Sequence, residues 1–406
     1  MNPHLHQLHL YPFERLRKLL GALTPPAALP PVNLSIGEPQ HATPKFVIDA
    51  LNANMSGLSR YPITTGSDAL RDTIAAWLSR RHHLQHLGRD HVLPTQGSRE
   101  ALFAITQTLV DPGAQSFALM PNPFYQIYEG AALLAGATPY FLNTTSDNGL
   151  RMPISAVPRD VLAKTSVMFA CSPGNPTGRV MTLDEWRELF ALSDEFNFVI
   201  VADECYSEIY FDDAKPPLGA LDAAEQLGRH DYKNLIVMGS LSKRSNVPGM
   251  RSGMAAGNAA LMKAFLLYRT YHGCAMSGTI QAASIAAWND EAHVIENRRL
   301  YREKFAAFYD IVNPVLPLSK PEAAFYYWAR VPVGISDEDF AIRLFEQAHI
   351  TVLPGSYLSR EAHGINPGSG FVRIALVSTV DDAIAAAQRI KDVVESLTVR
   401  TQAHAA

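Results

Sequence analysis

The sequence predicts an α/β protein built around a mostly parallel β-sheet. Between about residue 91 and residue 250, short apolar runs alternate with longer segments of helical periodicity. Polar clusters follow directly after several of these runs, where the carboxyl ends of parallel strands form a ligand-binding edge. The chain has 406 residues, which is enough for a large buried core and for two domains.

Composition narrows the function classes. The hydrophobic content of 47% and the charged content of 18% are typical of a soluble globular enzyme. The formal net charge of −4 gives no reason to expect a nucleic-acid partner. No stretch is long and apolar enough to cross a membrane, and the N-terminus lacks an apolar signal core. We therefore expect a cytoplasmic protein without a nucleic-acid or membrane partner.

Cysteine and histidine spacing predicts neither a disulfide nor a metal site. Cys171, Cys205 and Cys274 are widely separated and odd in number, as expected for reduced thiols. None of the 14 histidines stands at a ligand spacing together with a set of Glu or Cys residues.

The expected elements can be placed in chain order from periodicity and turn signals. Helical spacing covers residues 11–20, 44–55 and 67–81, and a turn-rich loop around Tyr61 separates the last two. The sheet strands are expected at 91–95, 116–120, 138–142, 166–170, 198–202 and 234–238. The C-terminal part is expected to contain a long helix at 291–309, strands within 318–331, a helix at 336–348, and strands beginning at 351 and 371.

Two segments could hold a phosphate group. Gly97 and Ser98 open a helix, whose first N–H groups and positive dipole end attract anions. A simple N-cap would explain this pair equally well. Ser240 and Arg251, which follow the strand at 234–238, offer a further hydroxyl and a cation for the same anion. Together these residues favour a phosphate cradle.

Lys243 lies between Ser242 and Arg251 in that second segment, and this arrangement suits pyridoxal phosphate. A lysine amine can react with the cofactor's aldehyde, while hydroxyls and the arginine hold its phosphate. Asp203 and Tyr206 follow the neighbouring strand and could serve the pyridine nitrogen and the phenolic oxygen. A solvated loop or a helix cap would explain either segment alone. Their combination predicts a pyridoxal-phosphate site.

These motifs resemble those of a known family. The chain is similar to the fold-type I pyridoxal-phosphate aminotransferases of the aspartate aminotransferase superfamily, class I/II, over nearly its whole length. Within that superfamily it most resembles the proteobacterial N-succinyldiaminopimelate aminotransferases. The similarity rests on the sequences at 171–179, 240–249 and 268–276.

The resemblance implies an architecture. We expect a large domain at residues 46–290, with a mostly parallel seven-stranded sheet between helices that binds pyridoxal phosphate. A smaller α+β domain is expected to combine residues 1–45 with residues 291–406. The family also implies a homodimer with a shared active site. In that dimer Tyr61 would contact the phosphate of the partner's cofactor.

The resemblance also assigns roles around the cofactor and the substrate. Tyr125 would stack on the pyridine ring, and Asn175 would donate to the phenolic oxygen beside Tyr206. Gly37 would offer its backbone near the substrate carboxylate. Arg373, a lone charge in an alternating strand, would grip the α-carboxylate, although a structural salt bridge would also explain it. Arg99 falls in the cofactor segment, with no role assigned to its side chain.

The implied reaction is transfer of an amino group from glutamate to N-succinyl-2-amino-6-ketopimelate, in lysine biosynthesis. Both substrates carry a distal carboxylate, for which Arg15, Arg17, Arg99 and Arg269 are candidates. Other amino and keto acids, such as N-acetylornithine, aspartate or aromatic ones, and β-elimination remain alternatives. A transcription regulator with an aminotransferase-like domain is disfavoured, because the N-terminal segment has no room for a winged helix.

Overall fold

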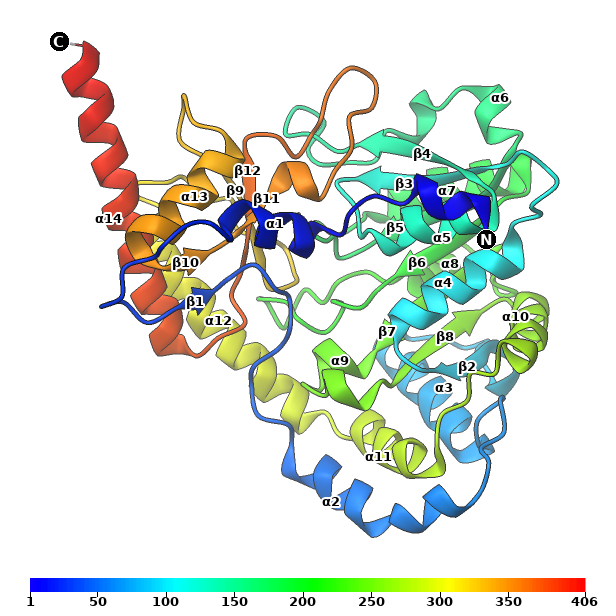
Figure 1. Ribbon diagram of the computed structural model, residues 1–406. Coiled ribbons are helices and arrows are strands. Elements are labelled where there is room, and N and C mark those ends of the chain that lie inside the picture. The colour runs from blue at the N-terminus through cyan, green and yellow to red at the C-terminus, as the bar shows by residue number, and fades with distance from the viewer. Residues whose placement is uncertain (406) are drawn as a thin grey trace.

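A seven-stranded sheet forms the centre of the larger lobe of the protein (Figure 1). The computed structural model describes residues 1–405, with side chains up to residue 397. The strand order is β2-β8-β7-β6-β5-β3-β4, and only β8 runs antiparallel to its neighbours. Their bounds are β2 (Val92–Thr95), β3 (Phe117–Asn122), β4 (Thr138–Asn143), β5 (Thr165–Cys171), β6 (Val199–Asp203), β7 (Leu235–Ser240) and β8 (Gly253–Gly257).

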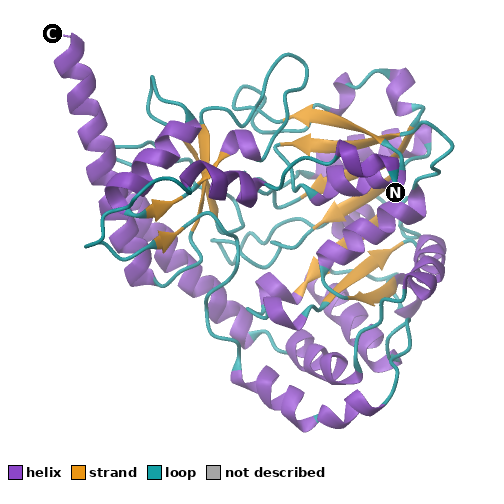
Figure 2. Cartoon of the chain, in the orientation of Figure 1, coloured by secondary structure: helices purple, strands orange, loops and turns teal. Residues whose placement is uncertain are grey.

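Helices cover both faces of this sheet (Figure 2), so both faces of its central strands are buried. Along β6, Ile200 and Ala202 belong to one core, whereas Val199 and Val201 belong to the other. The first core includes α3 (Asp68–His82), α7 (Leu183–Phe196), α8 (Ala220–Gln226) and α11 (Gly278–Asn289). The second includes α4 (Ser98–Leu109), α5 (Ile127–Ala135) and α10 (Ala259–His272). The predicted fold class is confirmed.

A smaller lobe packs around a three-stranded antiparallel sheet of order β11-β12-β9. Its strands are β9 (Tyr326–Arg330), β11 (Leu353–Pro354) and β12 (Phe371–Ala375), and β1 (Val32–Asn33) pairs with β10 (Ile350–Thr351) nearby. Its helices are α1 (Pro12–Leu20), α12 (Ala292–Val312), α13 (Asp337–Ala348) and α14 (Val380–Ala405). The long α12 leads from the larger lobe into the smaller one (Figure 1).

The predicted domain boundaries, at residues 45 and 291, agree with this arrangement but stay a proposal. The pairing of β1 with β10 joins the N-terminal segment to the smaller lobe. The first residues, however, cross to the larger lobe, where the 3-10 helix at Pro3–Gln7 packs against α5 (Figure 1). Further short helices are α2 (Lys45–Ala53), α6 (Arg159–Leu162) and α9 (Leu241–Arg244). Among the described residues, no helix has the length and apolar character needed to span a membrane.

Candidate active site

One cavity of about 440 Å³ lies between the two lobes. It opens at the carboxyl ends of β6 and β7, where parallel sheets bind ligands. Its volume is in the usual range for a small-molecule site. All but one of the residues predicted for the site line it: Gly37, Ser98, Arg99, Tyr125, Asn175, Asp203, Tyr206, Ser240, Ser242, Lys243, Arg251 and Arg373.

Lys243 faces this cavity from α9, which begins directly after β7. Its Nζ donates a hydrogen bond of 2.8 Å to the backbone carbonyl of Gly37, in the N-terminal segment. Burial lowers the pKa of the Lys243 amine to about 8, because an ammonium group loses hydration in the cavity. The side chain therefore carries a readily released proton, which suits a nucleophile or an acid–base group.

Asp203 ends β6 on the floor of the same cavity and is 4% exposed. Its Oδ2 accepts a hydrogen bond of 2.7 Å from the Tyr128 hydroxyl, and its Oδ1 accepts one from the Cys205 backbone. Burial raises the pKa of the Asp203 carboxyl. Within the described residues no basic side chain forms an ion pair with it. A cationic ring nitrogen placed in the cavity would compensate this buried acid.

Two side chains of the smaller lobe, Arg373 and Tyr326, form hydrogen bonds with residues of the larger lobe inside the cavity. Arg373, in β12, is 4% exposed and donates from Nη1 to Asn175 Oδ1 at 3.0 Å and from Nη2 to the Ser35 carbonyl at 2.7 Å. Its Nε is buried without a partner. The Tyr206 hydroxyl lies 2.8 Å from the Tyr326 hydroxyl, and burial raises the pKa of Tyr206 well above its usual value. Arg373 thus donates only to neutral acceptors, as expected of a cation that binds an anionic ligand.

The start of α4, Arg251 and nearby serine hydroxyls form another part of the cavity lining, here called the cradle. Gly97, at a φ of 84°, precedes α4, and a Cβ on it would lie 2.3 Å from Arg251 Nη2. Only glycine therefore allows the guanidinium so close to the start of the helix. Ser98 Oγ accepts from Cys205 Sγ, and Ser240 Oγ lies 2.9 Å from Ser242 Oγ. Hydroxyls, an arginine and the N-terminus of a twelve-residue helix make this a phosphate-type site.

These three parts fit pyridoxal phosphate. The cradle at Arg251 suits its phosphate, the uncompensated Asp203 suits its protonated ring nitrogen, and Lys243 suits its aldehyde. Tyr206 and Asn175 lie where hydroxyl and amide donors could serve a phenolic oxygen. The residues present are therefore those that this cofactor needs.

Tyr61 is the predicted site residue that the fold does not bring to the cavity. Its side chain is fully exposed, with 101% of its reference area accessible, and it lies outside the cavity lining. Three other residues matter that the motifs did not reveal. Tyr326 faces Gly37, on which a Cβ would lie 2.1 Å from the phenol oxygen; Tyr128 and Cys205 contact Asp203. Their aromatic or apolar neighbours made Tyr128 and Tyr326 look like packing residues.

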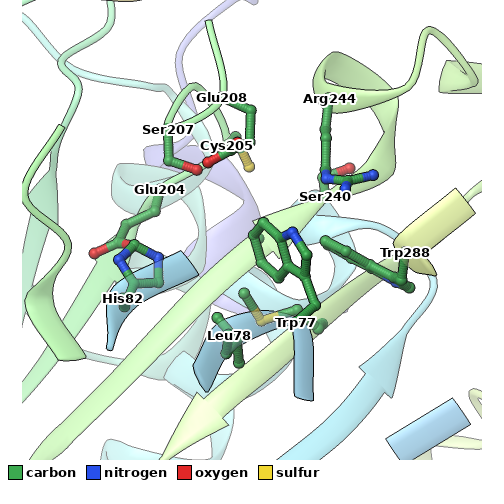
Figure 3. Close-up of a pocket in the computed structure, with 12 residues that line it drawn as sticks. Trp77, Leu78, His82, Glu204, Cys205, Ser207, Glu208, Ser240, Arg244 and Trp288 are labelled. Carbon is green, nitrogen blue, oxygen red and sulfur yellow. The ribbon is translucent and has the colours of Figure 1, made fainter. Parts of the chain in front are cut away.

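Next to the cavity is a small hollow, and residues that line it hold the segment that contains Lys243 (Figure 3). Arg244 is 1% exposed, and its guanidinium lies 5.2 Å from the ring of Trp77 and 5.1 Å from that of Trp288. It donates to the Ala287 carbonyl at 2.7 Å and forms an ion pair with Glu291. The buried cation therefore ties α9 to α3 and α11, which holds the backbone of Lys243 in place.

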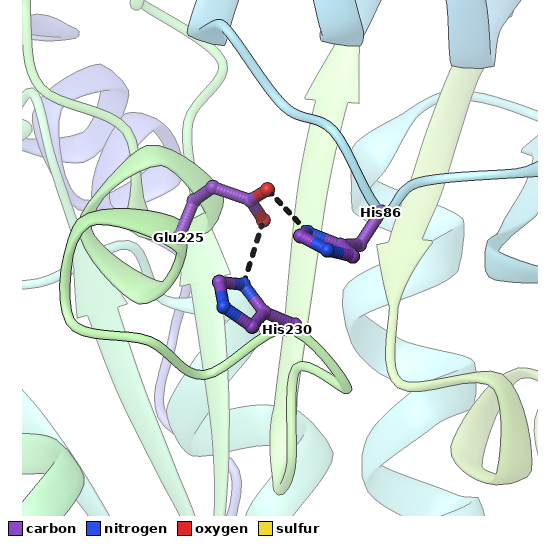
Figure 4. A group of neighbouring side chains, drawn as sticks. All are labelled: His86, Glu225 and His230. Atoms are coloured by element: carbon purple, nitrogen blue, oxygen red, sulfur yellow. Dashed lines mark hydrogen bonds and ion pairs between the residues drawn. The ribbon is translucent and has the colours of Figure 1, made fainter.

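Away from the cavity, His86, Glu225 and His230 bring three possible metal ligands together (Figure 4). Glu225 Oε1 lies 2.6 Å from His86 Nδ1, and Oε2 lies 3.8 Å from His230 Nδ1. The carboxylate also accepts from the Gln85 backbone and the Tyr232 hydroxyl. Because these groups already satisfy it, we interpret the group as an ion-pair cluster at the end of α8.

A second group, Glu100, His272 and Cys274, is also close enough to share an ion. Both oxygens of Glu100, however, accept from Arg269 Nη1, at 2.7 and 2.8 Å. A fixed guanidinium at that position repels a metal cation. The absence of a metal site from this protein stays a prediction.

Comparisons with known proteins agree with this geometry. The chain matches the family model "aminotransferase class I and II" over residues 30–390. It is 32% identical over 395 residues to the LL-diaminopimelate aminotransferase of Moorella thermoacetica, covering 96% of this chain and 97% of that one. The corresponding enzyme of Aquifex aeolicus is 30% identical over 370 residues, with 89% and 91% covered. The crystal structure of an aminotransferase from Neisseria meningitidis superposes with a TM-score of 0.93 at 49% identity, covering 97% and 100%.

The chain therefore belongs to the class I and II aminotransferases, whose members depend on pyridoxal phosphate. The family resemblance and the cofactor predicted from the sequence are confirmed. The roles of the individual residues stay predictions, as does the identity of the substrates.

The lowered pKa of Lys243 predicts how cofactor-free protein should respond to pH. Between about pH 7 and about pH 9 the unprotonated fraction of its amine rises from roughly a tenth to roughly nine-tenths. We expect the initial rate of pyridoxal-phosphate capture to rise about tenfold over that range, because only a neutral amine attacks an aldehyde. Stopped-flow absorbance measures this rate. A rate that keeps rising well above pH 9 would contradict the burial of this amine.

Proposed function

We propose that the protein transfers an amino group between glutamate and N-succinyl-2-amino-6-ketopimelate, a precursor of diaminopimelate and lysine, in the cytoplasm. The observation that supports the aminotransferase part is that the Lys243 amine lines one cavity with Asp203 and Arg373, neither of which has an ion-pair partner among the described residues. The diaminopimelate part is supported by the names of the relatives and by the motifs at 171–179, 240–249 and 268–276.

In this proposal each residue has one task. Arg251, Ser98, Ser240 and Ser242 would hold the cofactor phosphate, Tyr125 would stack on the ring, and Asp203 would keep the ring nitrogen protonated. When bound, the cofactor supplies an electron-withdrawing ring that makes the proton on the substrate Cα removable. Lys243 would take that proton as a base and return it as an acid. Its ability to do both follows from a pKa of about 8.

The substrate would be oriented by the residues that join the two lobes. Arg373 would hold the α-carboxylate with two parallel hydrogen bonds, and Asn175 and Gly37 would position neighbouring polar atoms. Tyr206 would donate to the phenolic oxygen of the cofactor. This geometry would keep the Cα hydrogen near the Lys243 amine while the lobes exclude water from it.

We further propose that the protein is a homodimer whose sites are completed across the interface. Near Tyr61 in the sequence, the apolar side chains of Met55, Leu58 and Ile63 are also exposed, which supports an interaction surface in this segment. A second copy covering it would bring Tyr61 toward the partner's cofactor phosphate. Sedimentation at the mass of one 44.5-kDa chain at micromolar concentration would contradict the dimer.

Mixing the purified holoenzyme with glutamate and then with keto acids tests the reaction and its substrates. We expect glutamate to bleach the visible absorbance of the bound cofactor, and the succinylated ketopimelate to restore it fastest. Restoration by another keto acid, such as oxaloacetate, at higher kcat/KM would keep the aminotransferase and reject the proposed acceptor. Absence of bleaching with every amino acid tried would reject the reaction itself.

LL-diaminopimelate is the second candidate substrate, because both relatives above carry its name. The succinylated and free compounds differ by one amide-linked succinyl group. The ratio of kcat/KM for N-succinyl-LL-2,6-diaminopimelate to that for LL-diaminopimelate, with 2-oxoglutarate as acceptor, decides between them. A ratio above about ten favours the succinylated substrate, whereas a ratio below one favours the free amino acid.

A further inference from the structure

The guanidinium of Arg99 is the cation of the cavity that the proposed reaction leaves without a task. Arg99 is the second residue of α4 and lines the cavity. Its Nε donates to the Tyr125 hydroxyl at 2.7 Å, and its Nη2 donates to the Tyr11 hydroxyl at 3.1 Å. No carboxylate of the described residues forms an ion pair with it, although Glu38 lines the same cavity.

The other arginines that could bind a second carboxylate have different surroundings. Arg269 is buried and holds both oxygens of Glu100. Arg15 faces Glu338 at 3.8 Å and lies over the ring of Tyr357. Arg17 is exposed on α1 and does not line the cavity. Of these four cations, Arg99 alone both faces the cavity and lacks an acidic partner.

The hydroxyls of Tyr11 and Tyr125 accept hydrogen bonds from Arg99 and can each donate a proton of their own to a bound ligand. A tyrosine hydroxyl has one proton to donate, and neither Tyr11 nor Tyr125 has a protein acceptor for that proton within the described residues. Two O–H groups and the free Nη1 of the guanidinium therefore belong to one hydrogen-bonded group in the cavity lining. This donor set matches the oxygens of a carboxylate.

We propose that Arg99, Tyr11 and Tyr125 form a subsite for the second carboxylate of a dicarboxylic substrate. This inference rests on the proposed function, in which both substrates are dicarboxylic. Arg373 comes from β12 of the smaller lobe and Arg99 from α4 of the larger lobe, so one substrate meets both by spanning the cavity. Tyr11 makes the segment before α1 a part of this subsite.

Binding of two unreactive acids of equal length tests the subsite. Glutarate has two carboxylates and valerate has one, and their dissociation constants for the holoenzyme can be measured by calorimetry. We expect the wild-type protein to prefer glutarate, and Arg99→Gln to weaken glutarate binding by about 10- to 100-fold, the loss of one charge-assisted contact. Valerate binding should change much less, so the preference disappears.

Two further variants sharpen the result. Tyr11→Phe removes one donor and keeps the cation, so it should weaken glutarate binding by a few-fold only. Arg17→Gln removes an exposed arginine of the neighbouring helix and should keep the wild-type preference. Circular dichroism and retained cofactor absorbance after dialysis report that each variant is folded and loaded.

The outcomes separate this subsite from the proposed function. If wild-type protein turns over glutamate and Arg99→Gln keeps the preference for glutarate, the subsite is wrong and the reaction stands. If Arg99→Gln loses cofactor on dialysis while the preference remains, Arg99 belongs to the phosphate cradle and the subsite is again wrong. If wild-type protein neither prefers glutarate nor reacts with glutamate, both the subsite and the dicarboxylic function are rejected.

Discussion

Replacing Lys243 with alanine should lower kcat by at least about 1,000-fold, because it removes the group that reacts with the cofactor and moves the Cα proton. The fold should survive, since Arg244 rather than Lys243 anchors α9. Steady-state turnover with glutamate measures the loss. The cofactor should still bind through the Arg251 cradle, and its absorbance should no longer show attachment to the protein.

Lys263→Ala provides a matched control. Lys263 is an exposed lysine on α10 and does not line the cavity, so its loss should leave kcat within about twofold. Turnover of Lys243→Ala at the wild-type rate would remove the basis for the catalytic assignment. Added methylamine, which can replace a missing lysine amine in solution, should restore part of the activity.

Replacing Arg373 with leucine should lower kcat/KM for glutamate by about 100-fold, chiefly through KM. Two charge-assisted hydrogen bonds to the α-carboxylate contribute about 1.5–3 kcal/mol each, part of which is offset by hydration of the free acid. Arg373→Lys keeps the charge but loses the parallel pair of donors, so it should fall between the wild type and the leucine variant. Initial-rate kinetics at several glutamate concentrations separate KM from kcat.

Arg330→Leu is the control for this substitution. Arg330 lies on the adjacent strand β9, opposite Phe371 in the register, and is exposed. Its loss should change packing over Phe371 slightly and leave KM unchanged. An unchanged KM in a folded Arg373→Leu protein would instead point to a purely structural role for Arg373, in which it holds Asn175 and the Ser35 carbonyl.

Most elements of the larger lobe can be predicted from the sequence, because its buried strands are short, apolar and followed by polar residues. Phe198–Asp203 illustrates this, since an apolar run ends at an acid and predicts both β6 and a site residue. Strand β8 has no counterpart among the strands that periodicity predicts. Gly253–Gly257 consists of small residues and methionine, without the β-branched and aromatic side chains that mark a strand.

The missing parts of the site depend on contacts between distant segments. Tyr326 stands in an aromatic stretch of β9 that resembles core, and only folding places its hydroxyl beside Tyr206 and Gly37. Tyr11 precedes a surface helix, and no local pattern indicates that it reaches Arg99 in α4. Tyr61 is the converse case, because its motif is local whereas its expected target would belong to another chain.

The contacts of Arg373 with Asn175, and of Tyr326 with Tyr206, each join a residue of the smaller lobe to one of the larger. The site therefore exists only while the lobes stay docked, although each lobe has a core of its own. Slight separation of the lobes would then inactivate the enzyme while its helices and sheets remained intact. Ligands that bridge the lobes would oppose that separation. The ligand-bound enzyme should therefore have a higher Tm than the ligand-free enzyme.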